Sequence, residues 1–245
     1  MSQFLLPKEG AGLEECEDAV GVNVRASRFA LADGATEAFD AGSWARALAE
    51  GWAGGETGAL TAEEFGRWAA QVGGRWHEGW EGRELPWYAE EKARAGSFAA
   101  FVGVEFEEAD GALRWRAVAL GDSCLVQRRG PRVLVAMPLG DPSEFGACPV
   151  LVPSRASALD AALARMSVAE GEAATGDVFL LLSDAAAAWF LKLSAGRDPA
   201  AEEFDSLLAA SENGALAALL RRERAAGRLK DDDVAAVRIA FGLDF

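Results

Sequence analysis

The chain has 245 residues, of which 51% are hydrophobic, and its 39 acidic and 24 basic residues give a formal net charge of -15. This length and composition allow a large buried core and favour one domain over residues 1–245, with two smaller domains as the alternative. Nucleic-acid binding requires a basic surface, so no nucleic-acid partner is expected. No apolar stretch reaches the roughly 20 residues that span a bilayer, and an acidic surface repels anionic lipid, so no membrane partner is expected.

The cysteines and the N-terminal segment bear on the cellular location, and both favour the cytoplasm. The first ten residues contain one short apolar patch, Phe4-Leu5-Leu6-Pro7, without a charged leader or a long apolar region, so export is not predicted. Cys16, Cys124 and Cys148 are odd in number, far apart and free of a Cys-x-x-Cys pattern. Neither a disulfide framework nor a thiolate zinc site is expected, and the cytoplasm is the predicted location.

The first third of the chain predicts a hairpin followed by helices. Short strands are expected over Val20–Val24 and Arg28–Ala32, joined by a polar turn. A helix capped by Asp40 or Ser43 follows, because large apolar residues recur at spacings of four, and it ends at a pair of glycines. Thr61 with a glutamate three residues later matches a capping box, so a second helix is expected to begin there and to continue in pieces toward residue 93.

Aromatic residues near the end of this second helix have two interpretations. Trp76, Trp80 and Trp87 would form a ligand cage if their rings stacked around a cation or a sugar. Tryptophans at helical spacing more commonly bury a helix face against a sheet, and we favour that interpretation. His77, the only histidine, lacks neighbours at metal-ligand spacing and is predicted to be structural.

From Gly96 onward the pattern becomes strand-like, with turn residues at regular intervals. Four strands of an antiparallel meander are predicted at Ser97–Phe106, Leu113–Leu120, Ser123–Arg128 and Arg132–Ala136. A long loop over Pro138–Ser154, rich in proline and glycine, is a candidate for substrate or partner selection. The remaining expected elements are helices at 157–166, 185–193, 201–210 and 214–226 and strands at 177–182 and 234–241, which makes the class α+β.

Acidic residues stand at the ends of five of these predicted strands. They are found in the motifs Glu17-Asp18-Ala19, Ala32-Asp33-Gly34, Gly121-Asp122-Ser123, Leu182-Ser183-Asp184 and Asp232-Asp233-Val234. Any one of them has an ordinary explanation as a turn or a helix cap, and Asp184 in particular would cap the helix that follows it. Five together indicate carboxylates gathered at one site, where divalent cations such as Mg²⁺ or Mn²⁺ would offset their mutual repulsion.

In order and approximate spacing, these five motifs resemble those of the metal-dependent protein phosphatases of type 2C, and a divergent bacterial branch in particular. The resemblance covers nearly the whole chain. It implies a four-layer αββα sandwich, in which two antiparallel sheets pack face to face and helices cover their outer surfaces. The metal site would lie at one end of the sandwich.

The resemblance also implies roles for individual residues. Asp18, Asp33, Asp184 and Asp232 would be the catalytic metal ligands, with Asp33 bridging two Mg²⁺ or Mn²⁺ ions and the carbonyl of Gly34 completing the second. Glu17 would hold a metal-bound water, and Asp122 would match a weaker, third metal position.

The implied activity is hydrolysis of phosphoserine or phosphothreonine in a phosphoprotein, with a metal-bridging water as the nucleophile. The alternative is a catalytically weak or inactive phosphatase fold that regulates a protein partner. A third interpretation is a metal-dependent phosphohydrolase acting on a small molecule.

Four positions depart from the family pattern. Leu13 occupies the place of an arginine that would bind substrate phosphate with both arms of its guanidinium, and Lys8 nearby offers only a point charge. Cys124 replaces a frequent arginine, Ala185 replaces a usual glycine, and Ala235 replaces a threonine or serine. Metal binding is therefore better supported by the sequence than phosphatase turnover.

Overall fold

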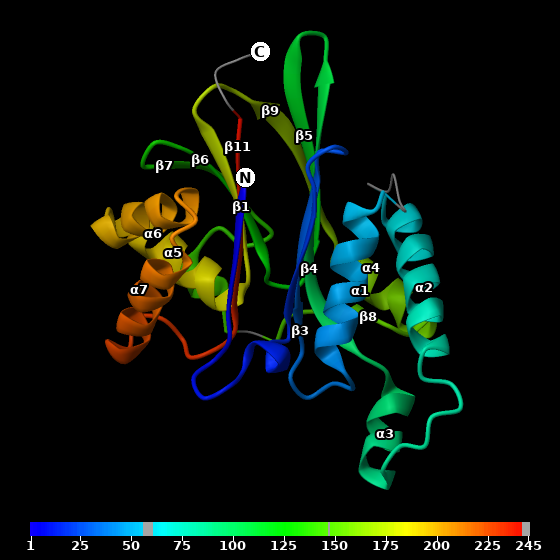
Figure 1. The fold of residues 1–245 in the computed structure, drawn as a ribbon. Helices are drawn as coiled ribbons and strands as arrows, with labels where there is room; N and C mark the ends of the chain where they lie inside the picture. Colours follow the sequence, from blue (N-terminus) through cyan, green and yellow to red (C-terminus); the bar gives the residue numbers. More distant parts are fainter. Residues whose placement is uncertain (56–60, 147, 242–245) are drawn as a thin grey trace.

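Two antiparallel sheets form the centre of the molecule in a computed structural model, which describes residues 1–55, 61–146 and 148–241 (Figure 1). In spatial order, the five-stranded sheet consists of β1 (Ser2–Leu6), β11 (Val234–Ala240), β10 (Asp177–Leu182), β6 (Cys124–Arg129) and β7 (Arg132–Met137). The six-stranded sheet, in the same order, consists of β2 (Asp18–Asn23), β3 (Arg28–Gly34), β4 (Phe98–Ala109), β5 (Ala112–Leu120) and β9 (Ser167–Ala173), with β8 (Val152–Pro153) paired to β4.

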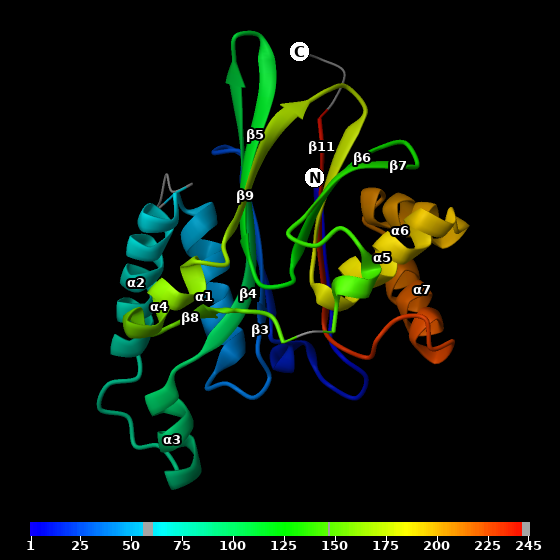
Figure 2. The ribbon, with the colours of Figure 1, turned by 180° about the vertical axis from the view of Figure 1, so that it is seen from behind.

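Helices cover the outer face of each sheet, which gives the four layers (Figures 1 and 2). Those on the side of the six-stranded sheet are α1 (Ala41–Ala53), α2 (Ala62–Glu78), α3 (Trp87–Ala95) and α4 (Leu159–Leu163). Those on the other side are α5 (Asp184–Gly196), α6 (Pro199–Ala209) and α7 (Asn213–Ala225). Short 3-10 turns occur at Leu13–Glu15, Pro142–Glu144 and Ala156–Ala158. The predicted αββα sandwich is confirmed. Within the described ranges, no helix is both long and apolar enough to cross a membrane.

Strand β3 shows why the central layers are buried on both faces. Phe29 and Leu31 point into the core between the two sheets, whereas Ala30 and Ala32 face the helix α1. Because successive side chains alternate across a strand, large residues fill the sheet-to-sheet space and small ones let a helix approach closely. A side chain at Gly21 would lie within 1.9 Å of a backbone oxygen of α1, which explains a glycine in the neighbouring strand.

The predicted helix starts and the first hairpin are confirmed. Asp40 stands at the N-cap position of α1 but makes no side-chain capping hydrogen bond there, whereas the hydroxyl of Thr61, the N-cap of α2, accepts a hydrogen bond from the Glu64 N–H at 3.2 Å. Trp76 is buried and donates its indole N–H to the Ser43 hydroxyl at 2.8 Å. Trp87 is 83% exposed, so these tryptophans do not line one cage.

The predicted four-stranded meander is wrong in one respect. Strands β4 and β5 pair in one sheet and β6 and β7 pair in the other, so the chain crosses between sheets over Gly121, Asp122 and Ser123. A three-residue corner has the same composition as a hairpin turn, and turn residues alone do not distinguish the two. Strands β1 and β9 lie outside the predicted elements, and the loop over Pro138–Ser154 contains a 3-10 turn and β8. Ala147 of that loop is outside the described residues.

Candidate metal centre

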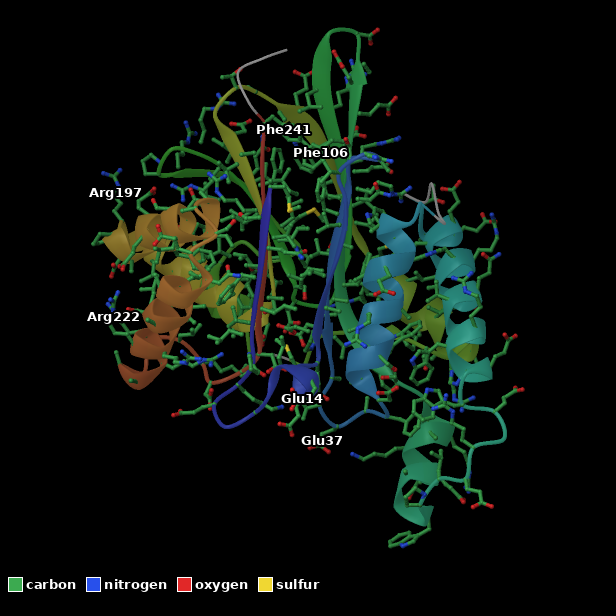
Figure 3. The ribbon with its side chains drawn as sticks, viewed as in Figure 1. Glu14, Glu37, Phe106, Arg197, Arg222 and Phe241 are labelled. Carbon is green, nitrogen blue, oxygen red and sulfur yellow. The ribbon has the colours of Figure 1, made fainter. Side chains whose placement is uncertain are left out.

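The five acidic motifs meet at one end of the sandwich, where β3, β5 and β10 end and β2, β6 and β11 begin. This end also carries Glu14 and Glu37, whereas Phe106 and Phe241 lie toward the opposite end (Figure 3). Because antiparallel neighbours run in opposite directions, one strand's last residue lies beside the next strand's first residue. Sheet pairing is therefore what gathers carboxylates from five distant parts of the sequence.

Asp18 and Asp33 face each other directly. They are register partners in the antiparallel pair β2 and β3, and Asp18 is only 4% exposed. Like charges directly opposite each other destabilise a sheet. Burial raises the pKa of both carboxyl groups well above the ordinary value, and the neighbouring acidic side chains raise it further.

The Asp18 carboxylate is also buried without a well-formed hydrogen bond. Both of its oxygens are buried, and neither makes a hydrogen bond of good geometry, although the nearby Ser183 hydroxyl favours the charged form. Buried polar atoms in folded proteins are normally hydrogen-bonded, so two bare carboxylate oxygens need an explanation. A cation bound between the sheets would supply one.

Asp184 and Asp122 join the cluster from the five-stranded sheet and from the crossing corner. Asp184 is the first residue of α5, directly after β10, where the positive end of the helix dipole favours a carboxylate. The N-cap is Ser183, so the ordinary explanation of Asp184 as the cap residue is not what the structure shows. Burial and the charge of Asp184 raise the pKa of Asp122 to about 6.

Three consecutive aspartates before β11 have different surroundings. Asp231 is exposed, and its carboxylate accepts a hydrogen bond from the Glu9 N–H at 2.9 Å. Asp233 is buried, and its two oxygens accept hydrogen bonds from the N–H groups of Lys8 and Glu17, each at 2.8 Å. Asp232 lies between them and interacts electrostatically with Asp18, Asp33 and Asp122.

Asp233 is thus a structural residue that the sequence interpretation missed. It fixes the segment before β2 to the start of β11 across 216 positions of sequence. The three consecutive aspartates are visible in the sequence. Which of them is buried depends on contacts with a distant segment, so the sequence alone does not reveal it.

Glu17 and Gly34 also lie in this region. The Gly34 N–H donates to the Glu17 carbonyl at 3.1 Å, and a side chain at position 34 would come within 2.7 Å of the Ala41 carbonyl. The Glu17 carboxylate pairs with the Lys8 ammonium at 3.6 Å. Leu13, at the place of the expected arginine, is 61% exposed and offers no charge.

The donor set fits a hard divalent cation by its chemistry, since Mg²⁺ and Mn²⁺ prefer carboxylate and carbonyl oxygens. The unpartnered oxygens of Asp18 support this fit. Over the described part of the chain, however, no three acidic, histidine or cysteine side chains are spaced as ligands of a single ion. The ammonium group of Lys230 pairs with the carboxylates of both Asp184 and Asp232.

Cysteine chemistry does not account for this site. Burial is the main cause that raises the pKa of Cys16 and of Cys124 to about 12, so both thiols are neutral at pH 7 and poor nucleophiles. The His77 imidazole lies 3.2 Å from the Ser154 hydroxyl, in a contact between α2 and the end of the long loop. The prediction of a structural histidine agrees with this position.

Two antiparallel sheets packed between helix layers define a four-layer αββα fold. Solved structures show which one: the chain has the fold of the serine/threonine protein phosphatases of type 2C. The photosystem II phosphatase PBCP matches with a TM-score of 0.61 at 14% identity, over 98% of each chain. The catalytic domain of the phosphatase PstP, solved in complex with 2 manganese ions, matches with a TM-score of 0.58 at 17% identity, over 96% of each chain.

A third similar structure is PppA, described as a key regulatory component of the T6SS in Pseudomonas aeruginosa. It matches with a TM-score of 0.53 at 20% identity, over 98% of this chain and 96% of that one. No protein-family model and no curated protein sequence matches the chain. The resemblance noted from the motifs is confirmed at the level of the fold.

Proposed function

We propose that this protein is a metal-dependent phosphatase that hydrolyses phosphoserine or phosphothreonine in a phosphoprotein. The observation that carries the proposal is the meeting of five strand-end aspartates, among them Asp18, whose buried carboxylate makes no hydrogen bond of good geometry. Similar structures include serine/threonine phosphatases, one of them in complex with manganese. The free cysteines are consistent with a reducing cytoplasm, and one phosphatase-like domain would comprise residues 1–245.

In this proposal, Asp18, Asp33, Asp184 and Asp232 hold two Mg²⁺ or Mn²⁺ ions together with the Gly34 carbonyl. When bound, the ions would acidify a bridging water and neutralise charge on the phosphoryl oxygens. Asp33 would be the ligand shared by the two ions. Glu17 orients a water through its carboxylate, and Asp122 contributes to a weaker third position.

A groove beside Asp122 is the proposed place for the substrate. It has a volume of about 470 Å³, and its lining includes Gly121, Asp122 and Arg165 together with Pro138, Leu139, Glu144, Cys148, Pro149 and Val150 of the long loop. The lining carries one basic side chain, the exposed Arg165, and two acidic ones, Asp122 and Glu144, so Arg165 is the group there that would pair with a substrate phosphate. The groove therefore connects the loop expected to select substrates with the acidic cluster.

A second candidate function is a regulatory module that binds metal or a phosphoprotein without turnover. Leu13 favours this candidate, because an exposed leucine stands where a phosphate-binding guanidinium is expected. Loss of one charge-assisted contact of about 1.5–3 kcal/mol would weaken substrate capture by roughly ten- to a hundred-fold.

Turnover of an aryl phosphate and of a phosphopeptide in Mn²⁺ separates the two candidates. For a phosphatase, Asp33→Asn and Asp184→Asn are each expected to reduce turnover at least about 100-fold, because each removes a metal ligand. Asp160→Asn, which removes an exposed carboxylate on α4, is the matched control and is expected to keep full activity.

Arg165→Ala tests the groove in the same assay, and it is expected to lower turnover of the phosphopeptide only. Metal binding without turnover of either substrate would contradict the phosphatase and favour the regulatory module.

A further inference from the structure

A lysine side chain lies within the acidic cluster. The Lys230 ammonium is 2.6 Å from an Asp232 carboxylate oxygen and 3.1 Å from an Asp184 carboxylate oxygen. These two aspartates come from different elements, the segment before β11 and the start of α5. One ammonium group therefore bridges two of the four proposed metal ligands.

The backbone around Lys230 is held firmly. Leu229 is buried in the core beneath α5 to α7, and its N–H donates to the Glu223 carbonyl at 3.2 Å. On the other side, the Asp232 N–H donates to the Lys230 carbonyl at 3.1 Å, and the Arg224 guanidinium donates to the Asp232 carbonyl. The position of Lys230 beside the cluster is thus fixed by the fold.

The side chain of Lys230 is largely exposed to solvent. It is 62% exposed, so its ammonium group can leave the two carboxylates for water without opening a cavity in the core. Exposed ion pairs contribute little stability singly, but here one cation serves two carboxylates within a group of five. A lysine ammonium carries one charge and makes hydrogen bonds, whereas Mg²⁺ or Mn²⁺ carries two and binds the oxygens directly.

We propose that Lys230 is a tethered counter-ion that competes with divalent metal for Asp184 and Asp232. Metal that binds these two carboxylates must displace the ammonium group, so Lys230 lowers the metal affinity of the cluster. The inference rests on the proposed function in that it takes Asp184 and Asp232 as metal ligands. The inference adds that Lys230 determines the concentration of free metal at which the site becomes occupied.

Calorimetric titration with Mn²⁺ tests the inference without any substrate. Lys230→Met is expected to bind Mn²⁺ at least about tenfold more tightly than the unmodified protein, the scale of one lost charge-assisted contact. Lys192→Met is the matched control, because it removes the same charge from an exposed position on α5, the helix that begins at Asp184. Its affinity is expected to equal that of the unmodified protein.

Thermal unfolding without metal provides a second readout. Lys230→Met is expected to unfold at a lower temperature than the unmodified protein, because the carboxylates lose their counter-ion, and to gain more from added Mn²⁺. If Lys230→Met does not fold, the same two measurements are made on Lys230→Gln, which is also neutral and similar in length, and the same results are expected.

The outcomes separate this inference from the proposed function. Equal or weaker Mn²⁺ affinity in both Lys230 variants would overturn the inference and leave phosphatase turnover untouched. Tighter binding without turnover would support the inference and contradict the phosphatase. If neither the unmodified protein nor the variants bind Mn²⁺, both are overturned.

Discussion

Asp18 and Asp33 are placed where a sheet built only for stability would not place them. Two carboxylates face each other across β2 and β3, next to three further aspartates. Such a pair destabilises the fold, and proteins accept this kind of cost at functional sites. The sequence locates each residue at a strand end, but only the register of the two strands shows that they are opposite.

Asp233 is expected to be more important for stability than its neighbours in the run. Asp233→Ala leaves the N–H groups of Lys8 and Glu17 without their acceptors, so the free energy of unfolding should fall by about 2–4 kcal/mol. Asp231→Ala removes one exposed hydrogen bond and a half-exposed ion pair with Arg224 at 3.7 Å, and should cost less than about 1 kcal/mol. Urea unfolding measures both, and equal losses would show that Asp233 does not fix the N-terminal segment.

At the scale of the element, the corner between β5 and β6 determines how the site is built. The chain leaves one sheet at Leu120 and enters the other at Cys124, and Asp122 stands between them. Gly121 has a φ of +111°, and a side chain there would lie 2.5 Å from the Ala100 side chain. Both the backbone conformation and the space therefore require glycine at this position.

Gly121→Ala is expected to destabilise the protein by about 2–4 kcal/mol, through strain in the backbone and collision with Ala100. Gly111→Ala is the matched control, because Gly111 has a φ of +76° but no atom within 4 Å of its missing side chain. It should cost only about 1–2 kcal/mol. Denaturant unfolding gives the loss in free energy of unfolding for each variant, and the difference between the two losses is the cost of the collision. Equal losses would mean that the corner relaxes and avoids the collision.

The elements differ in how well the sequence predicts them. Helix α2 and strand β10 follow from a capping box and an apolar run, which are local signals. Strand β9, with the sequence Ser-Val-Ala-Glu-Gly-Glu-Ala, has few residues of high β propensity and is stabilised by pairing with β5 at the edge of its sheet. Such a strand depends on a partner distant in sequence, so no local pattern reveals it.

The same limit applies to the site. The positions of Asp18, Asp33, Asp122 and Asp184 can be predicted from strand ends, because strand ends are a local property. The contact of Lys230 with Asp184 joins residues 46 positions apart and cannot be predicted in this way. Nor does the sequence show which of the three aspartates before β11 is buried.

For the whole molecule, the acidic cluster predicts an unusual dependence of stability on pH. Burial raises the pKa of Asp18, Asp33 and Asp122, the last to about 6, so the folded state binds more protons than the unfolded state above pH 4 or so. Stability without metal should therefore fall as pH rises from about 4 through 6. The contribution of Asp122 alone is at most about 3 kcal/mol.

Melting temperatures at pH 5 and pH 7 in the presence of a chelator check this expectation. The protein should melt at a higher temperature at pH 5, and Asp122→Asn should reduce the difference. Added Mn²⁺ should stabilise the protein more at pH 7, because the ligands are then deprotonated. If the metal-free protein melts at a higher temperature at pH 7 than at pH 5, titratable groups outside the cluster dominate the pH dependence of its stability.

The pairing of β1 with β11 has a consequence for the order of folding. Strand β11 lies between β1 and β10, so an early strand of the chain has no neighbour until one of its last segments has been synthesised. Four strands of the other sheet, β2 to β5, are consecutive in sequence and neighbours in space, so each has its partner soon after it is synthesised. We therefore expect the six-stranded sheet to form first during translation, and β1 to remain unpaired until β11 is available.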